Sequence, residues 1–233
     1  MRDRPAVGVV DPDEAAGAID LLEHDLMGLL HPAIPVRMLP TRTRTGQAVA
    51  AAIPEHARGK PIEIWFQDEA RVGQQGTLTR LWARRGSRPR AVRDTRYQWA
   101  YIFGAACPAR AVAAGLVMPF ADTEAMNAHL TEIGRTVAPG AHALLVLDGA
   151  GWHGAGGLIV PDNLSLVTLP PYAPELNPIE NVWAYLRGNK LAITVFDSYD
   201  AIVAKCCEAW NFFANDPSAI ASITSRGWAE VNT

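Results

Sequence analysis

The sequence predicts an α/β fold with a mixed β-sheet, in which antiparallel strands come first along the chain and parallel strands follow. Short strand-like runs separated by glycine and proline turns occupy residues 62–118. A uniformly apolar run, 143–147, returns after a helical segment, as a parallel strand covered on both faces does. At 233 residues and 49% hydrophobic content, the chain can bury the core of one such domain.

Residues 1–55 differ from the rest of the chain, because they are rich in proline, alanine and aspartate. We expect one helix, from Pro12 to Leu30, with an apolar stripe that packs against other parts of the protein. The acidic opposite face of this helix disfavours a role against DNA phosphates. A linker follows, so we divide the chain into an atypical N-terminal segment, 1–55, and a main domain, 56–233.

The main domain opens with the antiparallel part of the sheet. Short glycine-containing turns at 73–76 and 86–89 predict that the first three strands form a meander. The four strands expected in this part are 62–67, 78–83, 97–106 and 112–118.

The second half alternates helices with strands. Asp122 or Thr123 can cap a helix that Pro139 ends. The later elements are expected to be strands at 143–147 and 164–169 and helices at 178–187 and 199–213. A meander followed by parallel strands, with helices on both faces, is the layout of a ribonuclease H-like mixed sheet.

Two acidic residues come directly after apolar strands. Asp68 follows the run 62–67, and Asp148 follows the run 143–147. A carboxylate at such a position is costly to bury unless it is paired or binds a metal ion. Glu69 competes with Asp68, but neighbouring residues of a strand face opposite sides, and we favour Asp68.

A third acid lies at the start of a predicted helix. Asn177 is a good N-cap, Pro178 suits the first helical position, and Glu180 falls in the first turn. The alternative is structural, because Asn-x-x-Glu is close to a capping box, in which the carboxylate bonds back to the helix start. Trp183 follows Glu180, and we expect it to pack in the core or to stack on a base.

Together, Asp68, Asp148 and Glu180 predict a divalent metal site. Hard oxygen ligands suit Mg²⁺ or Mn²⁺, and two such ions about 3.5 to 4 Å apart can activate a nucleophile and stabilise the leaving oxygen of a phosphodiester. We expect Asp68 to bridge both ions, while Asp148 and Glu180 each complete one of them. The predicted chemistry is phosphoryl transfer.

The formal net charge of −3 argues by itself against a nucleic-acid partner. However, residues 80–96 hold seven of the 21 Lys and Arg residues. We expect this basic run to bind DNA, with a solvated hairpin tip as the alternative, and His153 to contact phosphate or instead cap the following segment. The residues predicted to bind DNA are Arg80, Arg84, Arg85, Arg88, Arg90 and His153.

The cysteines and the apolar runs exclude other classes. Cys107, Cys206 and Cys207 form no Cys-x-x-Cys pair, which disfavours a zinc site and a disulfide framework and favours positions in the core. No apolar run approaches the roughly 20 residues that a membrane span needs, and the N-terminus lacks the apolar region of a signal peptide. We therefore expect no membrane partner and a cytoplasmic location.

Three stretches carry specific motifs. They are Phe66-Gln-Asp-Glu-Ala70, Leu147-Asp-Gly-Ala-Gly-Trp-His153 and Leu169-Pro-Pro-Tyr-Ala-Pro-Glu-Leu-Asn-Pro-Ile-Glu-Asn-Val-Trp183. Together they resemble the Asp-Asp-Glu (DDE) transposases of bacterial insertion sequences in the mariner superfamily. The resemblance covers about residue 60 to the C-terminus and implies a ribonuclease H-like catalytic domain, divalent-metal catalysis and DNA as substrate. By the same resemblance, Asp68, Asp148 and Glu180 match the catalytic triad.

This resemblance implies cleavage at the ends of an insertion sequence and strand transfer into target DNA, at a TA dinucleotide, by a homo-oligomer. Two features depart from the family. Residues 1–55 show no basic paired-helix pattern of the family's N-terminal DNA-recognition domains, and Gly149 stands where members commonly carry Asn or Gln. The alternatives are a truncated, inactive remnant that only binds DNA or oligomerises, and a metal-dependent nuclease of the same fold.

Overall fold

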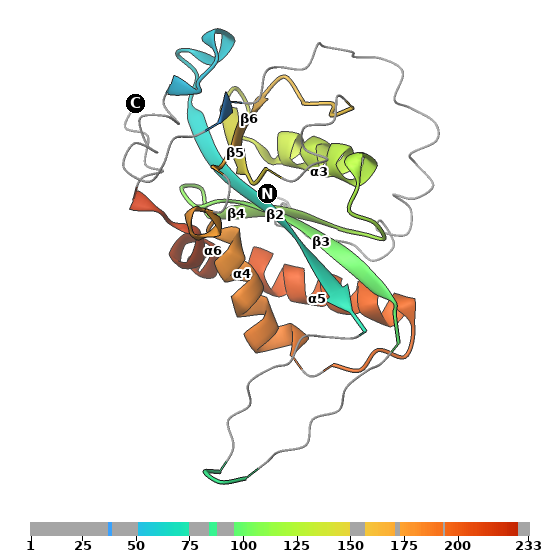
Figure 1. Cartoon of the computed structure of the whole chain (residues 1–233). Helices are drawn as coiled ribbons and strands as arrows, with labels where there is room; N and C mark the ends of the chain where they lie inside the picture. The colour runs from blue at the N-terminus through green and yellow to red at the C-terminus, as the bar shows by residue number, and fades with distance from the viewer. Residues whose placement is uncertain are drawn as a thin grey trace, which may run out of the picture.

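The computed structural model describes residues 37–38, 51–74, 84–87, 96–149, 157–170, 173–192 and 194–227. In these ranges the chain forms a six-stranded sheet with the strand order β1-β6-β5-β2-β3-β4 (Figure 1). The strands are β1 (Arg37–Met38), β2 (Ile62–Gly73), β3 (Trp99–Cys107), β4 (Val112–Met118), β5 (His142–Leu147) and β6 (Leu164–Thr168). The helices are α3 (Thr123–Thr136), α4 (Ile179–Leu186), α5 (Tyr199–Ala214) and α6 (Pro217–Thr224).

Three short helical turns complete the described elements. These are the 3₁₀ turns η2 (Glu55–Ala57) and η4 (Pro174–Leu176) and the π-helical turn η5 (Arg187–Leu191). Within the described ranges, no helix has the length and apolar character that crossing a membrane requires. The division of the chain at residue 55 stays a prediction.

The antiparallel part of the sheet is formed by β2, β3 and β4. The predicted strands at 97–106 and 112–118 are confirmed, whereas the predicted strand at 78–83 and the predicted helix from Pro12 to Leu30 lie outside the described residues. The predicted end of the first strand at Gln67 was wrong. β2 continues to Gly73, because its ladder with β3 extends to the pair Gly73–Trp99. Asp68 therefore lies inside a strand and not after one.

The parallel part is formed by β5, which pairs with β2 on one side and with β6 on the other. Every residue of β5 is buried, as expected for a central strand between two helical layers. Before it, α3 begins at a cap made by Asp122, whose side chain accepts a hydrogen bond from the Ala125 backbone N–H at 2.9 Å. These observations confirm the predicted crossover helix and the predicted parallel strand.

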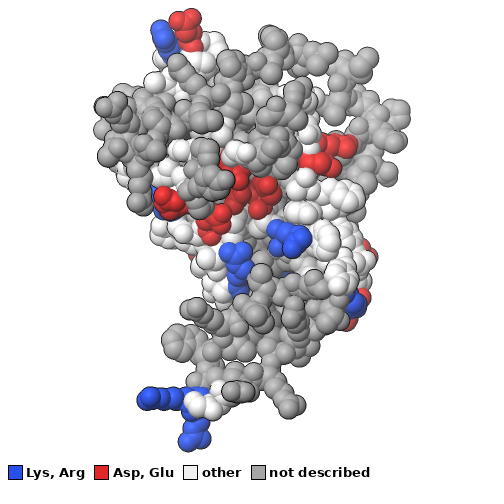
Figure 2. All heavy atoms as spheres, in the orientation of Figure 1, with Lys and Arg blue, Asp and Glu red and all other residues white. Residues whose placement is uncertain are grey.

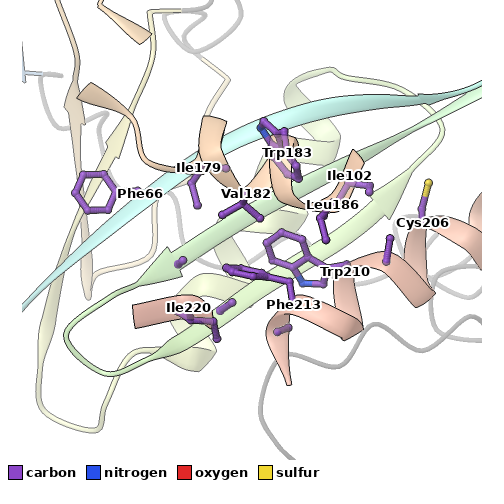
Figure 3. Packing of buried hydrophobic residues seen from close by; sticks show 14 of the residues in the cluster. Phe66, Ile102, Ile179, Val182, Trp183, Leu186, Cys206, Trp210, Phe213 and Ile220 are labelled. Carbon is purple, nitrogen blue, oxygen red and sulfur yellow. The ribbon is translucent and has the colours of Figure 1, made fainter. Parts of the chain in front are cut away.

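The sheet separates two apolar layers. One face packs against α3, and the other packs against α4, α5 and α6 (Figure 1). Figure 3 shows the second layer, in which Trp183 of α4 and Trp210 of α5 lie over the sheet. All three cysteines are buried, as predicted. The α/β class with helices on both faces of a mixed sheet is therefore confirmed.

Candidate active site

The two aspartates lie at the same level of two neighbouring strands. The parallel ladder between β2 and β5 runs from the pair Ile62–His142 to the pair Phe66–Val146. If this register is continued by two residues, Asp68 lies opposite Asp148, which directly follows β5 and is exposed. The predicted convergence of the two strand positions agrees with this register.

Asp68 faces the helix that carries Glu180. Its Oδ2 accepts a hydrogen bond from Nε1 of Trp183, on α4, at 2.7 Å. Because successive side chains alternate between the faces of a strand, Glu69 leaves the sheet on the opposite side. The geometry thus favours Asp68 over Glu69 as the acid that meets α4.

The start of α4 is attached to the strand beside Asp68. Asn177 is buried, and its Nδ2 donates to the backbone carbonyl of Gln67 at 2.8 Å. Its Oδ1 accepts from the Ile179 backbone N–H at 3.2 Å, so Asn177 also caps the helix. The helix begins at Ile179, one residue later than predicted, and Glu180 lies in its first turn.

The capping-box alternative for Glu180 is not supported by this geometry. That alternative requires the Glu180 carboxylate to accept a hydrogen bond from the Asn177 backbone N–H. Within the described part of the chain the Glu180 side chain makes no such bond, and the residue is exposed. The capping function belongs to the Asn177 side chain, which leaves the Glu180 carboxylate available for other interactions.

Electrostatic coupling joins Asp68 to Glu180. Burial raises the pKa of the Asp68 carboxyl to about 7, against the lowering effect of the Trp183 hydrogen bond. The negative charges of Glu180 and Glu69 raise the same pKa further. A carboxylate in such surroundings is stabilised by a nearby cation. Figure 2 shows acidic side chains gathered in the middle of the face it presents.

The three predicted ligands do not form a finished metal-binding group. Among the described residues, no three His, Cys, Asp or Glu side chains are arranged so that they could hold a metal ion. The chemistry of the donors still fits a divalent cation, because carboxylate oxygens are the preferred ligands of Mg²⁺ and Mn²⁺. Asp148 and Glu180 are both exposed, so their side chains can change rotamer without disturbing the core.

The predicted basic residues are only partly described. Arg84 and Arg85 are exposed on a turn in which Ser87 bonds back to Arg84 and Gly86 has a φ of 85°. Figure 2 shows basic side chains on this turn, at the end of the molecule away from the acidic group. Arg80, Arg88, Arg90 and His153 lie outside the described residues.

Arg96, from the same basic run, has a structural role. Its guanidinium donates hydrogen bonds to the backbone carbonyls of Phe196 and Asp197, which precede α5. Gln74, at the end of β2, also donates to the Phe196 carbonyl, at 3.0 Å. Arg96 therefore joins the sheet to a distant part of the chain.

Sequence reasoning missed two contacts of the site. The bond between Trp183 and Asp68 was not predicted, although Trp183 follows Glu180 by three residues and therefore lies on the same face of the helix. The bond from Asn177 to the carbonyl of Gln67 was also missed, since Asn177 was expected only to cap. Helical spacing was the one signal in the sequence that pointed to the first contact.

Comparisons with known proteins agree with the fold and the motifs. A profile of the DDE superfamily endonuclease family matches residues 63–202, which include Asp68, Asp148 and Glu180. The chain is 57% identical over 131 residues to the uncharacterized protein y4pE/y4sA of Sinorhizobium fredii, an alignment that covers 56% of this chain and 97% of that protein.

A solved structure has the same fold. The Mos1 transposase, in a paired-end complex with the left transposon end, has a TM-score of 0.54 and 15% identity. The alignment covers 96% of this chain and 77% of that one, and it confirms the ribonuclease H-like mixed sheet. These comparisons confirm the predicted resemblance, and the chain belongs to the DDE superfamily endonuclease family.

Proposed function

We propose that this chain is the catalytic domain of a DNA transposase, which cuts the ends of an insertion sequence and joins them to target DNA. One observation carries the proposal. Asp68 is hydrogen-bonded to the helix that carries Glu180, and the β2–β5 register, continued two residues past its last pair, sets Asp68 opposite Asp148. This supports the proposal that the three acids, from distant parts of the sequence, meet at the ends of neighbouring strands, as metal-dependent phosphoryl transfer requires.

In this proposal Asp68 binds two divalent ions, Mg²⁺ or Mn²⁺, and Asp148 and Glu180 each complete one of them. The bound ions would activate the attacking water and stabilise the leaving oxygen. The fold holds two of the acids in place, because Asp68 is paired with Gly104 of β3 within a strand and Glu180 lies on a helix attached to that strand. The exposed Asp148 and Glu180 side chains would adjust to complete the site.

The two reactions use the same centre. In the first, water attacks a phosphodiester at the element end, the P–O3′ bond breaks, and a 3′ hydroxyl is released. In the second, that hydroxyl attacks a target phosphodiester, for which we propose a TA site, and a new P–O bond replaces the one that breaks. Each step moves a proton from the attacking oxygen to the departing oxygen and needs no oxidant.

DNA is the proposed partner, and a homo-oligomer is the proposed active assembly. The matched Mos1 transposase was solved in a paired-end complex with a transposon end. In this chain the exposed Arg84 and Arg85 are suited to contact phosphates. We also propose that the protein acts in the cytoplasm, where an insertion sequence meets bacterial DNA.

A remnant that only binds DNA is the second candidate. The observation that favours it is that the described acids do not already form a metal-binding group. Gly149, directly after Asp148, also removes a side chain that the family commonly has at that place. A nuclease of the same fold would share the first reaction and lack strand transfer.

Incubation with end-labelled duplex and Mn²⁺ tests the proposal, with duplexes taken from the DNA that flanks the reading frame. We expect cleavage by the unchanged protein, none by Asp148→Ala or Glu180→Gln, and normal cleavage by Asp162→Ala. Asp162 is an exposed acid on a turn before β6 and serves as the matched control. Retarded but uncut DNA supports the remnant, and cutting without joined products supports the nuclease.

A further inference from the structure

Trp183 connects two of the proposed metal ligands. It follows Glu180 by three residues on α4, so the two side chains lie on the same face of the helix. Its Nε1 donates a hydrogen bond to Oδ2 of Asp68 at 2.7 Å. A short bond from an N–H to a carboxylate is charge-assisted when the acid is ionised, and such bonds are about twice as strong as neutral ones.

The Trp183 ring is held by the residues below it. Gly104 is the cross-strand partner of Asp68, and a Cβ atom at Gly104 would lie 2.8 Å from Cη2 of Trp183. The ring also packs against Trp210 of α5, with 6.0 Å between the ring centroids (Figure 3). Trp183 is only 3% exposed, so its N–H cannot turn away from Asp68 without moving the core.

The bond is more than a way to satisfy a buried N–H group. Trp210 lies in the same layer and is fully buried, yet its Nε1 has no hydrogen-bond partner among the described residues. Burial of an indole in this layer therefore does not by itself bring an acceptor from the described residues. In this layer Trp183 directs its N–H to the Asp68 carboxylate, and on the opposite face of the sheet Trp65 directs its N–H to the Glu63 carboxylate at 2.8 Å.

Occupation of one oxygen leaves the other available. The Trp183 bond holds Oδ2 and restricts rotation of the Asp68 carboxylate, which the backbone N–H of Glu69 also contacts, and Oδ1 has no bond to Trp183. Groups that orient metal ligands typically change metal affinity or activity by about 10- to 100-fold when they are removed. The same side chain also fixes the distance between the strand with Asp68 and the helix with Glu180.

We propose that Trp183 is a positioning residue, which orients the Asp68 carboxylate for a divalent ion and keeps it beside the helix turn that carries Glu180. This inference rests on the proposed function, because it assumes that Asp68 binds the ion. Packing alone would make Trp183 a core residue, and the inference assigns it a second role as the group that orients Asp68.

The test measures Mn²⁺ binding from the spectrum of unbound Mn²⁺, by electron paramagnetic resonance, in the full chain without DNA. Trp183→Phe keeps an aromatic ring and removes the N–H. We expect its Mn²⁺ affinity to fall about tenfold or more. Trp65→Phe is the matched control, because it removes an indole N–H that donates to the Glu63 carboxylate on the opposite face of the sheet, and we expect it to change the affinity less than about twofold.

A second variant distinguishes the loss of the hydrogen bond from misfolding. Replacement of Trp183 by 3-benzothienylalanine keeps the two-ring shape and removes only the N–H, and it should weaken Mn²⁺ binding as Trp183→Phe does. Unchanged affinity in this variant overturns the inference. Equal losses in Trp183→Phe and Trp65→Phe also overturn it, since the general loss of a buried indole–carboxylate bond would then explain both.

A third variant, Asp68→Asn, distinguishes a wrong role for Trp183 from a wrong assignment of Asp68 as a metal ligand. If Mn²⁺ binding is lost in Asp68→Asn and kept in the Trp183 variants, the proposed function stands and the role of Trp183 is wrong. If the unchanged protein and Asp68→Asn bind Mn²⁺ equally, Asp68 is not a ligand and both proposals fail.

Discussion

At the scale of single residues, Asp68 is an acid placed where its charge is unfavourable. Burial raises the pKa of its carboxyl from 3.8 to about 7, and the neighbouring charge of Glu180 adds to the increase. Such an arrangement lowers the stability of the metal-free protein. A residue of this kind is expected at a functional site, where a bound cation compensates for the charge.

Asp68→Asn should therefore stabilise the metal-free protein in a pH-dependent way. Between pH 4 and 7 the folded state keeps a proton on Asp68 that the unfolded state has lost, so stability falls as pH rises, by at most about 1.4 kcal/mol per pH unit. Below pH 4 Asp68 is protonated in both the folded and the unfolded state. Its ionisation should then contribute little to the difference in unfolding free energy between the variant and the unchanged protein. The stability gained by Asp68→Asn should grow between pH 4 and 7 and stay constant above pH 7.

Urea unfolding in a chelator at several pH values measures this effect. The difference between the two proteins is the informative quantity, because it removes the contributions of His129 and His142. Burial lowers the pKa of both histidines, to about 3 and about 4, so they make stability rise with pH in both proteins. A difference independent of pH would show that Asp68 ionises normally in the folded state.

At the scale of elements, the central feature is the attachment of α4 to β2. Asn177 caps the helix through Oδ1 and bonds to the strand through Nδ2. The Trp183 bond to Asp68 forms a second attachment six residues later, nearly two helical turns along. Two contacts at different levels fix both the position and the direction of the helix that carries Glu180.

Asn177→Ala should weaken both folding and metal binding. We expect a loss of about 1–3 kcal/mol in the free energy of unfolding, because a cap is removed and a buried carbonyl loses its donor. Mn²⁺ affinity should fall as well. Ser198→Ala is the control, since Ser198 caps α5 through a 3.1 Å bond and does not contact the acids. Equal Mn²⁺ binding by the two variants would contradict a role for the α4 attachment in the site.

Gly104→Ala should act through the aromatic layer. The added Cβ atom would lie 2.5 Å from Cζ3 of Trp210 and 2.8 Å from Cη2 of Trp183, so the rings must move. We expect a loss of about 1–3 kcal/mol in stability and weaker Mn²⁺ binding. Gly188→Ala, where nothing lies within 4 Å of the new atom, should be tolerated. Thermal unfolding and Mn²⁺ titration of both variants check this, and unchanged behaviour of Gly104→Ala would refute the close packing.

The elements also show what the sequence could predict. Apolar periodicity and Asn177-Pro178 placed β4, β5 and α4 within about one residue, because local preferences determine those boundaries. The end of β2 was predicted six residues too early, since its outer half is polar and is held by pairing with β3. The Trp183 bond joins residues 115 apart, so helical spacing could place Trp183 on the face of Glu180 but could not identify Asp68 as its partner.

At the scale of the whole molecule, the proposed chemistry lies on one face of the sheet, and the other face is covered by packing alone. The layer of α4, α5 and α6 contains both Trp183 and Glu180, whereas α3 covers the opposite face (Figure 1). The exposed turn with Arg84 and Arg85 extends away from both layers. A long DNA substrate could contact this turn while one of its phosphates lies at the acids.

Replacing both Arg84 and Arg85 by Ala should weaken DNA binding without affecting Mn²⁺ binding. Each lost phosphate contact should reduce the slope of log affinity against log salt by about 0.9, so the loss should be largest at low salt. Fluorescence anisotropy with a labelled duplex at several salt concentrations measures this. Arg135→Ala, an exposed arginine on α3, is the control and should leave the slope unchanged. An unchanged slope in the double variant would support a solvated turn instead.

The most direct measurement for the central proposal is anomalous X-ray scattering from crystals of the protein soaked in Mn²⁺. The account predicts a manganese peak about 2 Å from a carboxylate oxygen of Asp68, with Asp148 or Glu180 as a second ligand. Crystals of the Asp68→Asn variant, soaked in the same way, should lack the manganese peak. A fully soaked crystal with no manganese at these three acids, or with manganese unaffected by Asp68→Asn, would contradict the proposal.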